Sequence, residues 1–266
     1  MGRDVMALAG QTPVAPFTVA KDLTIRDLRS AFAAGWRDFL AYPAFGLFFA
    51  GFYAVGGALV YGAMLKFNMS GWFMTIAAGF PLLAPFAVVG LYEVSRLRGE
   101  GEPVTWKPVF RALGGKGEEQ QVLMIGIILF VAFSFWMILA HGIFAIFLGE
   151  SGIGSESTGL FLSYEAIAML LVGSFVGALV ALALFAITVT SLPMLVDHDI
   201  DFITAMIVSM GVVRSNRLVM ILWAIFMATL MFVAMVPMML GLFVVLPVLG
   251  HASWHLFRRA VRPTLA

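Results

Sequence analysis

The chain has no cysteine and few charged residues among its 266 positions. Without cysteine it can form no disulfide bond, no thiolate nucleophile and no cysteine-bound iron–sulfur cluster. Charged side chains make up 12% of the residues and hydrophobic side chains 62%, whereas a soluble domain is about a quarter charged and about half apolar. Together with a mean hydropathy of +1.00, this composition predicts an integral membrane protein.

A secretory signal pattern is also absent from the N-terminal segment. Asp4, Pro13 and Pro16 interrupt the basic-then-apolar order that such a signal needs. The predicted division of the chain is a disordered N-terminal tail (1–20), a membrane domain (21–260) and a C-terminal tail (261–266).

Six apolar segments are long enough to cross a membrane, because a spanning helix needs about 20 apolar residues. The last two come from one uncharged stretch, 218–257. As a single helix this stretch would be about 60 Å long, twice the thickness of the hydrocarbon core. Pro237 therefore predicts a turn that makes it a hairpin. The predicted spans are 44–65, 72–93, 122–148, 166–192, 218–236 and 238–257.

Lysine and arginine lie almost entirely on one side of the predicted spans. Of the sixteen such residues, only Lys66 falls in a loop on the other side. Because basic loops stay in the cytoplasm, we expect both termini there, with residues 110, 205 and 262 cytoplasmic and residue 155 outside. The expected location is the bacterial inner membrane.

Three connecting segments resemble one another, and each precedes a pair of predicted spans. Capped, amphipathic helices with basic residues lie in the plane of the membrane interface. The alternative is that any amphipathic connector has such a pattern. The fold expected is all-α: six transmembrane helices in three helical hairpins, each preceded by a cytoplasmic interfacial amphipathic helix. These interfacial helices are predicted at 24–38, 105–113 and 201–213, with Thr24, Thr105 and Asp201 as their N-terminal caps.

Small residues at intervals of four predict close helix packing in two spans, because they let a neighbouring backbone approach. They are Gly46, Ala50, Ala54, Ala58 and Gly62 in the first span, and Gly173 and Gly177 in the fourth.

The histidines do not form a haem site in this topology. His251 and His255 are four residues apart on one helical face, so they cannot take opposite axial positions on one haem. His141 is predicted near the opposite membrane surface, and His198 lies in a cytoplasmic loop. We expect no cofactor, and we expect His251 to face neighbouring helices and bond a hydroxyl or a carbonyl.

Motifs of metal-dependent and hydrolytic enzymes are missing. Residues 197–201, Asp-His-Asp-Ile-Asp, begin like a calcium loop but lack its glycine turn and closing glutamate. We interpret them as the acidic start of a helix. No charged residue falls in the middle of a predicted span, where ion-coupled transporters keep their relays. The sequence therefore disfavours an enzyme, a metal site and an ion-driven transporter.

Opposite charges are predicted at one depth, where the second, fourth and sixth spans reach the cytoplasm. Hydrogen-bonded charge pairs survive partial burial better than lone charges do. The alternative is that these side chains reach solvent independently. The predicted pairs join Glu93 or Asp197 to His255, Arg258 or Arg259, within a rim cluster that also contains Arg96 and Asp199.

Three motifs carry a resemblance to a known family: PFAVVGLYEVSR (85–96), SLPMLVDHDIDFITAM (191–206) and LPVLGHASWHLFRR (246–259). They resemble uncharacterised bacterial integral-membrane proteins that form a domain of unknown function, some provisionally labelled cytochrome c oxidase subunits. The resemblance covers roughly 23–260. A weaker likeness, LPMLVD followed by RSN at 214–216, is to the membrane domain of some glycerophosphodiester phosphodiesterases. Neither family has established catalytic residues, so the resemblance implies a fold and no reaction.

These observations predict a non-enzymatic inner-membrane protein that binds lipid or a membrane partner. It would act as a scaffold, an assembly factor or a passive conduit. Expected partners are membrane lipid and either another membrane protein or a second copy of the chain, with no nucleic acid. The alternative is a redox or respiratory-chain component, which the family label and the histidines would support.

Overall fold

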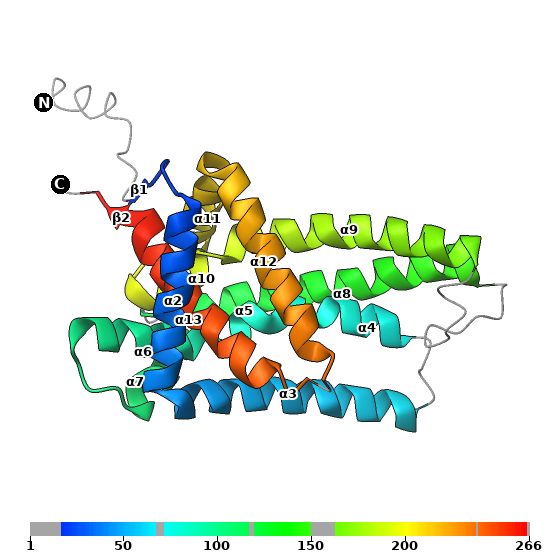
Figure 1. Cartoon of the computed structure of the whole chain (residues 1–266), viewed down its shortest axis with the longest axis horizontal. Helices are drawn as coiled ribbons and strands as arrows, with labels where there is room; N and C mark the ends of the chain where they lie inside the picture. The colour runs from blue at the N-terminus through cyan, green and yellow to red at the C-terminus, as the bar shows by residue number, and fades with distance from the viewer. Residues whose placement is uncertain (1–16, 68–71, 117–119, 150–162, 238, 265–266) are drawn as a thin grey trace, which may run out of the picture.

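The computed structural model describes residues 17–67, 72–116, 120–149, 163–237 and 239–264. This part of the chain is almost entirely helical, and the longest helices run along the long axis of the molecule (Figure 1). The helices are α2 (Ile25–Ala41), α3 (Pro43–Lys66), α4 (Phe73–Gly79), α5 (Ala84–Ala87), α6 (Val89–Glu100), α7 (Trp106–Arg111), α8 (Gln121–Leu148), α9 (Tyr164–Thr188), α10 (Ser191–Asp197), α11 (Phe202–Ser215), α12 (Arg217–Met235) and α13 (Leu242–Ala260), with 3-10 turns η2 (Phe80–Leu83) and η3 (Ala112–Gly114) and strands β1 (Phe17–Val19) and β2 (Val261–Pro263).

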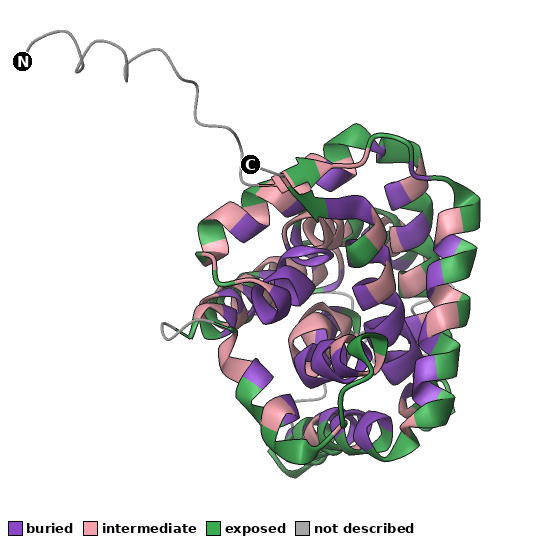
Figure 2. Cartoon of the chain, turned by 90° about the vertical axis from the view of Figure 1, so that its left-hand side faces the viewer, coloured by how far each residue is buried: buried purple, intermediate pink, exposed green. Residues whose placement is uncertain are grey.

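Five helical stretches are long and apolar enough to cross a membrane. The helices carry large apolar side chains on their outer surfaces, such as Phe52, Ile138 and Leu171, each more than two-thirds exposed. Viewed from the end that carries both termini, buried residues face the centre of the bundle and exposed residues face outward (Figure 2). The five stretches are Pro43–Lys66, Thr75–Glu100, Gln121–Leu148, Tyr164–Asp197 and Arg217–Met235.

The sixth predicted span, 238–257, is not among them: α13 is long enough, but His251, His255, Arg258 and Arg259 make its second half too polar. This half of α13 packs along α2 inside the bundle. A Cβ atom on Gly35 would lie 2.6 Å from the backbone nitrogen of Ala252 and 2.7 Å from the carbonyl oxygen of Val248. Only glycine permits so close an approach of two helix backbones. Near the other end of this contact, Arg259 of α13 reaches Asp27 of α2, so the two helices run antiparallel.

The first half of α13 follows α3 instead. Pro247 packs on Gly46, and Met239, in the turn before α13, packs on Gly57. Gly57 is fourteen residues from Pro43, so the turn lies about 21 Å along α3 and about 14 Å short of its far end. The chain does turn back near Pro237, as predicted, but it does so beside the middle of α3, and six spans are not confirmed.

The predicted ridge of small residues on α3 is correct in its first half only. Gly46, Ala50 and Ala54 are buried, whereas Ala58 and Gly62 are exposed. The contact with α13 ends at the turn that precedes this helix, and a Cβ atom on Gly62 would meet no atom within 4 Å. In α9, Gly177 packs closely against the ring of Trp136, while a Cβ on Gly173 would touch only Ile143 at 4.0 Å.

The three predicted connecting helices are present as α2, α7 with η3, and α11. Thr24 forms a capping box with Asp27, and the Asp201 side chain accepts a hydrogen bond from the backbone nitrogen of Thr204. Thr105 occupies the N-cap of α7, but its side chain makes no capping hydrogen bond. The cap position is as predicted, but the capping bond is missing, because the third residue of α7, Pro108, has no N–H to donate.

The predicted tails, 1–20 and 261–266, each include a strand. β1 and β2 pair antiparallel, with Thr18 opposite Arg262. Asn216 fastens the segment after β1: its Oδ1 accepts from the nitrogen of Leu23 (3.0 Å) and its Nδ2 donates to the oxygen of Ala20 (2.7 Å). The first sixteen residues lie outside the described part of the chain. The strand pair places the two ends of the membrane domain at one end of the molecule (Figure 1).

Candidate functional site

A buried carboxylate, Asp38, joins three helices at the end of the molecule that carries the termini. It belongs to the buried stripe of α2, which also contains Leu28, Ala31 and Gly35 at helical spacing. Only 4% of Asp38 is exposed. A buried carboxylate is costly unless donors surround it, and here the donors come from α6 and α13.

Asp38 accepts hydrogen bonds on both oxygens. Its Oδ2 accepts from the hydroxyl of Ser95 at 2.6 Å and lies 2.7 Å from Nε2 of His255. Its Oδ1 accepts from the guanidinium of Arg98. Burial would raise the pKa of Asp38, but the hydrogen bonds from His255 and Ser95, together with nearby positive charge, hold it below its ordinary value. The carboxylate is therefore ionised and fully paired.

Ser95 extends this network to His251, whose Nδ1 lies 2.7 Å from the serine oxygen. An ionised carboxylate cannot donate, so the serine proton is directed to Asp38 and the Nδ1 proton of His251 to Ser95. His251 thus faces neighbouring helices and bonds a hydroxyl. Its Nε2 has no partner among the described residues.

Serine, histidine and aspartate are also the residues of a hydrolytic triad, but they are connected differently here. In a triad the serine proton goes to histidine and the carboxylate orients that histidine. In this network the serine donates to the carboxylate, and Ser95 and His251 are respectively 1% and 0% exposed. The arrangement fastens α2, α6 and α13 together and presents no nucleophile to a substrate.

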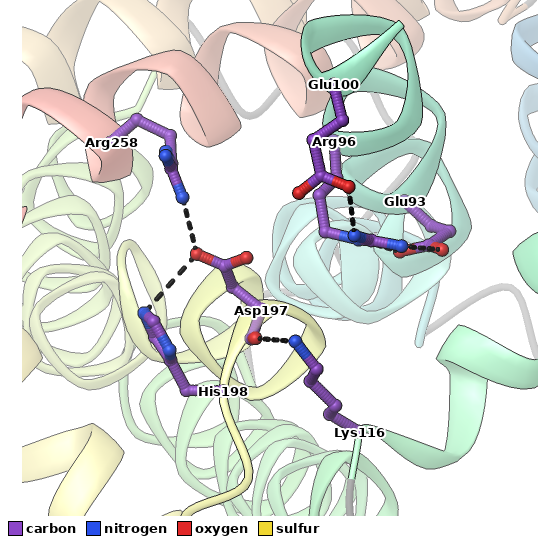
Figure 3. Close-up of polar contacts among 7 residues, drawn as sticks. All are labelled: Glu93, Arg96, Glu100, Lys116, Asp197, His198 and Arg258. Atoms are coloured by element: carbon purple, nitrogen blue, oxygen red, sulfur yellow. Dashed lines mark hydrogen bonds and ion pairs between the residues drawn. The ribbon is translucent and has the colours of Figure 1, made fainter. Parts of the chain in front are cut away.

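Of the predicted rim pairs, Asp197 with Arg258 is present (Figure 3). Nη1 of Arg258 lies 2.8 Å from Oδ2 of Asp197. The same aspartate lies 3.3 Å from Nε2 of His198, and its backbone oxygen accepts from Nζ of Lys116 at 2.6 Å. Asp197 therefore ties α13 to the end of α10 and to the segment before α8.

The other rim residues do not join this pair. Glu93 and Glu100 both bind Arg96 within α6, at 2.7 and 2.6 Å (Figure 3). Arg259 binds Asp22 and Asp27. The exposed Asp199 has no side-chain hydrogen bond or ion pair with the described residues. With His255 on Asp38, the predicted single cluster is four separate groups. Arg96 bonds the acids of its own helix, and the three bases of α13 bond acids at separate places, near the start of α2, near its end and at the end of α10.

Sequence reasoning missed Asp38, and a signal for it was available. The prediction counted the basic residues of 21–37 and passed over an acid that continues the apolar stripe Leu28, Ala31, Gly35. An acid on the buried stripe of an amphipathic helix indicates a buried partner. The identity of the partners, Ser95 and Arg98, depends on how α6 packs and has no comparable local signal.

A second feature is an apolar groove between α9 and α12. Two adjoining cavities of about 330 and 410 Å³ share six lining residues and form it. Pockets for small molecules have a similar size and a similar apolar lining. The shared residues are Ala78, Leu82, Ala178, Ala181, Ala228 and Phe232.

The groove is long. Its lining follows α9 from Met169 to the C-cap residue Val189, which is about 30 Å and equals the thickness of the hydrocarbon core. It exists because the hairpin of α12 and α13 stops beside the middle of α3 and leaves the rest of α9 uncovered. Near its inner end, the hydroxyl of Tyr92 has no partner among the described residues.

The remaining histidine, His141, lies at the opposite end of the bundle. Its ring stacks on Trp72, with centroids 3.9 Å apart and planes 6° apart. Within the described ranges, no three His, Asp or Glu side chains are grouped so that they could hold a metal ion. His251 and His255 of α13 both belong to the Asp38 network, so His141 makes its contact far from the other two.

Residues 72–197 match a family described as "Predicted integral membrane protein (DUF2189)". The match covers just under half of the chain, from Trp72 before α4 to the end of α10, whereas the expected resemblance covered 23–260. It carries neither the cytochrome c oxidase label nor the phosphodiesterase likeness. No curated protein and no solved structure matches the chain. The family match and the five apolar helices identify an integral membrane protein with no activity attached.

Proposed function

We propose that this protein is a non-enzymatic lipid-binding scaffold of the bacterial inner membrane. The observation that carries the proposal is the apolar groove between α9 and α12, which is as long as the hydrocarbon core is thick. Alanine and glycine along α9 leave room for a chain, and the α12 residues Ile221, Ile225 and Phe232 border it. An extended acyl chain has the length and polarity of this space.

The proposed orientation places α2, α7, α11 and both termini on the cytoplasmic side. Fifteen of the sixteen lysines and arginines would then be cytoplasmic. In Figure 1, α2 crosses the direction of α3, α8 and α9. Its exposed face mixes Arg26, Arg29 and Arg37 with Ile25 and Trp36, which suits the membrane interface.

The groove proposal is tested by photo-crosslinking. The protein is reconstituted with a phospholipid that carries a diazirine in one acyl chain, and the labelled peptides are mapped. We expect labelling concentrated in 178–189 and 221–232. Ala228→Phe, which fills the groove, should remove it, whereas the control Ala58→Phe, on an exposed face of α3, should not. Equal labelling of 52–60 and the groove would refute the proposal.

The redox alternative gains no support from the histidines: His251 and His255 bond Ser95 and Asp38 in one network, and His141 stacks on Trp72 at the opposite end of the bundle. The absorption spectrum of the purified protein tests it directly. A Soret band that persists through purification would replace the lipid scaffold with a haem protein.

A further inference from the structure

Arg217 stands at the head of the groove-lining stripe of α12. The lining residues of this helix recur at intervals of four, three and four, at Ile221, Ile225, Ala228 and Phe232. Arg217 precedes Ile221 by four residues, so it lies on the same face one turn, about 6 Å, nearer the cytoplasmic end. Its guanidinium is thus placed at the inner mouth of the apolar groove.

This arginine has no acidic partner in the described part of the chain. Arg217 and Arg214, three residues earlier at the corner between α11 and α12, are exposed, and neither forms an ion pair with any described residue. The other arginines of α6 and α13 are all paired with carboxylates. Free positive charge therefore lies where the apolar groove meets the cytoplasmic interface. Tyr92 also lines this part of the groove.

We infer that the groove selects an anionic phospholipid, with one acyl chain along α9 and α12 and the phosphate at Arg217 and Arg214. Arginine matches phosphate geometry with paired N–H donors, and the apolar lining accepts the chain. This inference rests on the proposed lipid groove and adds the class of headgroup and its site.

Native mass spectrometry of the delipidated protein tests the headgroup site. The probes are phosphatidylglycerol and phosphatidylcholine with identical acyl chains, offered together in a neutral detergent. The wild type should retain phosphatidylglycerol in preference. Arg217→Gln should reduce that preference about tenfold, the effect of losing hydrogen bonds to a charged group, and Arg217→Lys should restore most of it. The control Arg26→Gln, on the exposed face of α2, should leave it unchanged.

The outcomes separate the two proposals. If Arg217→Gln and the double change with Arg214→Gln leave the preference intact, the headgroup inference is wrong and the groove remains. If Ala228→Phe, checked for folding by its helical circular dichroism, retains both lipids as the wild type does, the groove itself is wrong and the inference falls with it. A dimer that Ala228→Phe dissociates would overturn both, because a second copy of the chain would then occupy the groove.

Discussion

At the scale of single residues, Asp38 has the largest structural role among the charged groups described. It accepts from Ser95, Arg98 and His255 at once, and through Ser95 it holds His251. A buried carboxylate without donors costs free energy. Removing the carboxylate while its buried donors remain also costs free energy, because the donors are then unpaired. The network therefore positions α2 and α6 on α13.

Replacing Asp38 by Asn should destabilise the protein by about 2–3 kcal/mol, because the positive Arg98 and the ring of His255 lose an ionised acceptor. Unfolding in mixed detergent micelles measures the loss. The control Asp199→Asn removes an exposed carboxylate that has no polar contact with the described residues, and it should leave stability unchanged. An Asp38→Asn variant as stable as the wild type would show that the network contributes nothing.

The stability difference between the wild type and Asp38→Asn should depend on pH. The pKa of Asp38 is lowered by folding, so its stabilising effect is full above its unfolded pKa of about 3.9. The effect is lost as the pH falls through the lower folded value. The stability difference between wild type and Asp38→Asn should therefore be constant from pH 8 to pH 5 and shrink below about pH 4. A difference that shrinks already near pH 6 would assign the effect to another group.

At the scale of helices, the contact between α2 and α13 depends on Gly35. The backbone atoms of Ala252 and Val248 occupy the space that a Cβ atom would need. Backbone cannot move aside as the end of a side chain can, so the two helices would have to separate along their whole contact. The position of α13, and with it the Asp38 network, depends on this one missing side chain.

Gly35→Ala should cost about 1–3 kcal/mol, the usual penalty for overpacking a tight contact. Gly62→Ala is the matched control, because the same substitution there meets no atom within 4 Å and should be neutral or stabilising by up to about 1 kcal/mol. Thermal unfolding of both variants checks the pair. Equal behaviour of the two variants would contradict the close approach of α2 to α13.

The hairpin of α12 and α13 gives a second prediction at this scale. Its turn packs beside Gly57, in the middle of α3, and Leu240 in the turn is 66% exposed. Since the chain has no cysteine, Leu240→Cys introduces a unique thiol. In the membrane it should react with a membrane-impermeant maleimide from neither side. The control is Lys66→Cys, at the far end of α3, which should react from outside. If the Leu240→Cys variant is labelled equally well from outside, α12 and α13 both cross the membrane and there are six spans.

At the scale of the whole molecule, the basic residues and the strand pair both place the termini together. β1 and β2 join the two ends of the membrane domain. The two termini lie on the same side whether or not the hairpin of α12 and α13 crosses the membrane, because the start of α12 and the end of α13 lie on one side in both cases. The orientation of the bundle therefore does not depend on the number of spans.

Reporter fusions should place residues 110, 205 and 262 in the cytoplasm and residue 155 outside. Residue 155 lies outside the described part of the chain, so its test depends on the positive-inside rule and on the pairing of α8 with α9. An external residue 262 would contradict the proposed orientation.

The membrane class, the principal apolar helices, the turn near Pro237 and the caps at Thr24 and Asp201 could be predicted from the sequence. Each depends on local chemistry: apolar length, a missing N–H, or a side chain that reaches its own backbone three residues on. One rim pair, Asp197 with Arg258, followed from charge and approximate depth.

Only the tertiary structure decided the place of α13, the partners of Asp38 and the groove. The uncharged stretch 218–257 predicted two spans, but an uncharged helix can face lipid or pack in the angle between α2 and α3, and α13 does the latter. Which base pairs with which acid depends on helix crossings of a few ångströms, set by Gly35 and Gly46. The groove exists because the hairpin of α12 and α13 stops beside the middle of α3 and leaves part of α9 uncovered. No local sequence pattern shows where that hairpin stops.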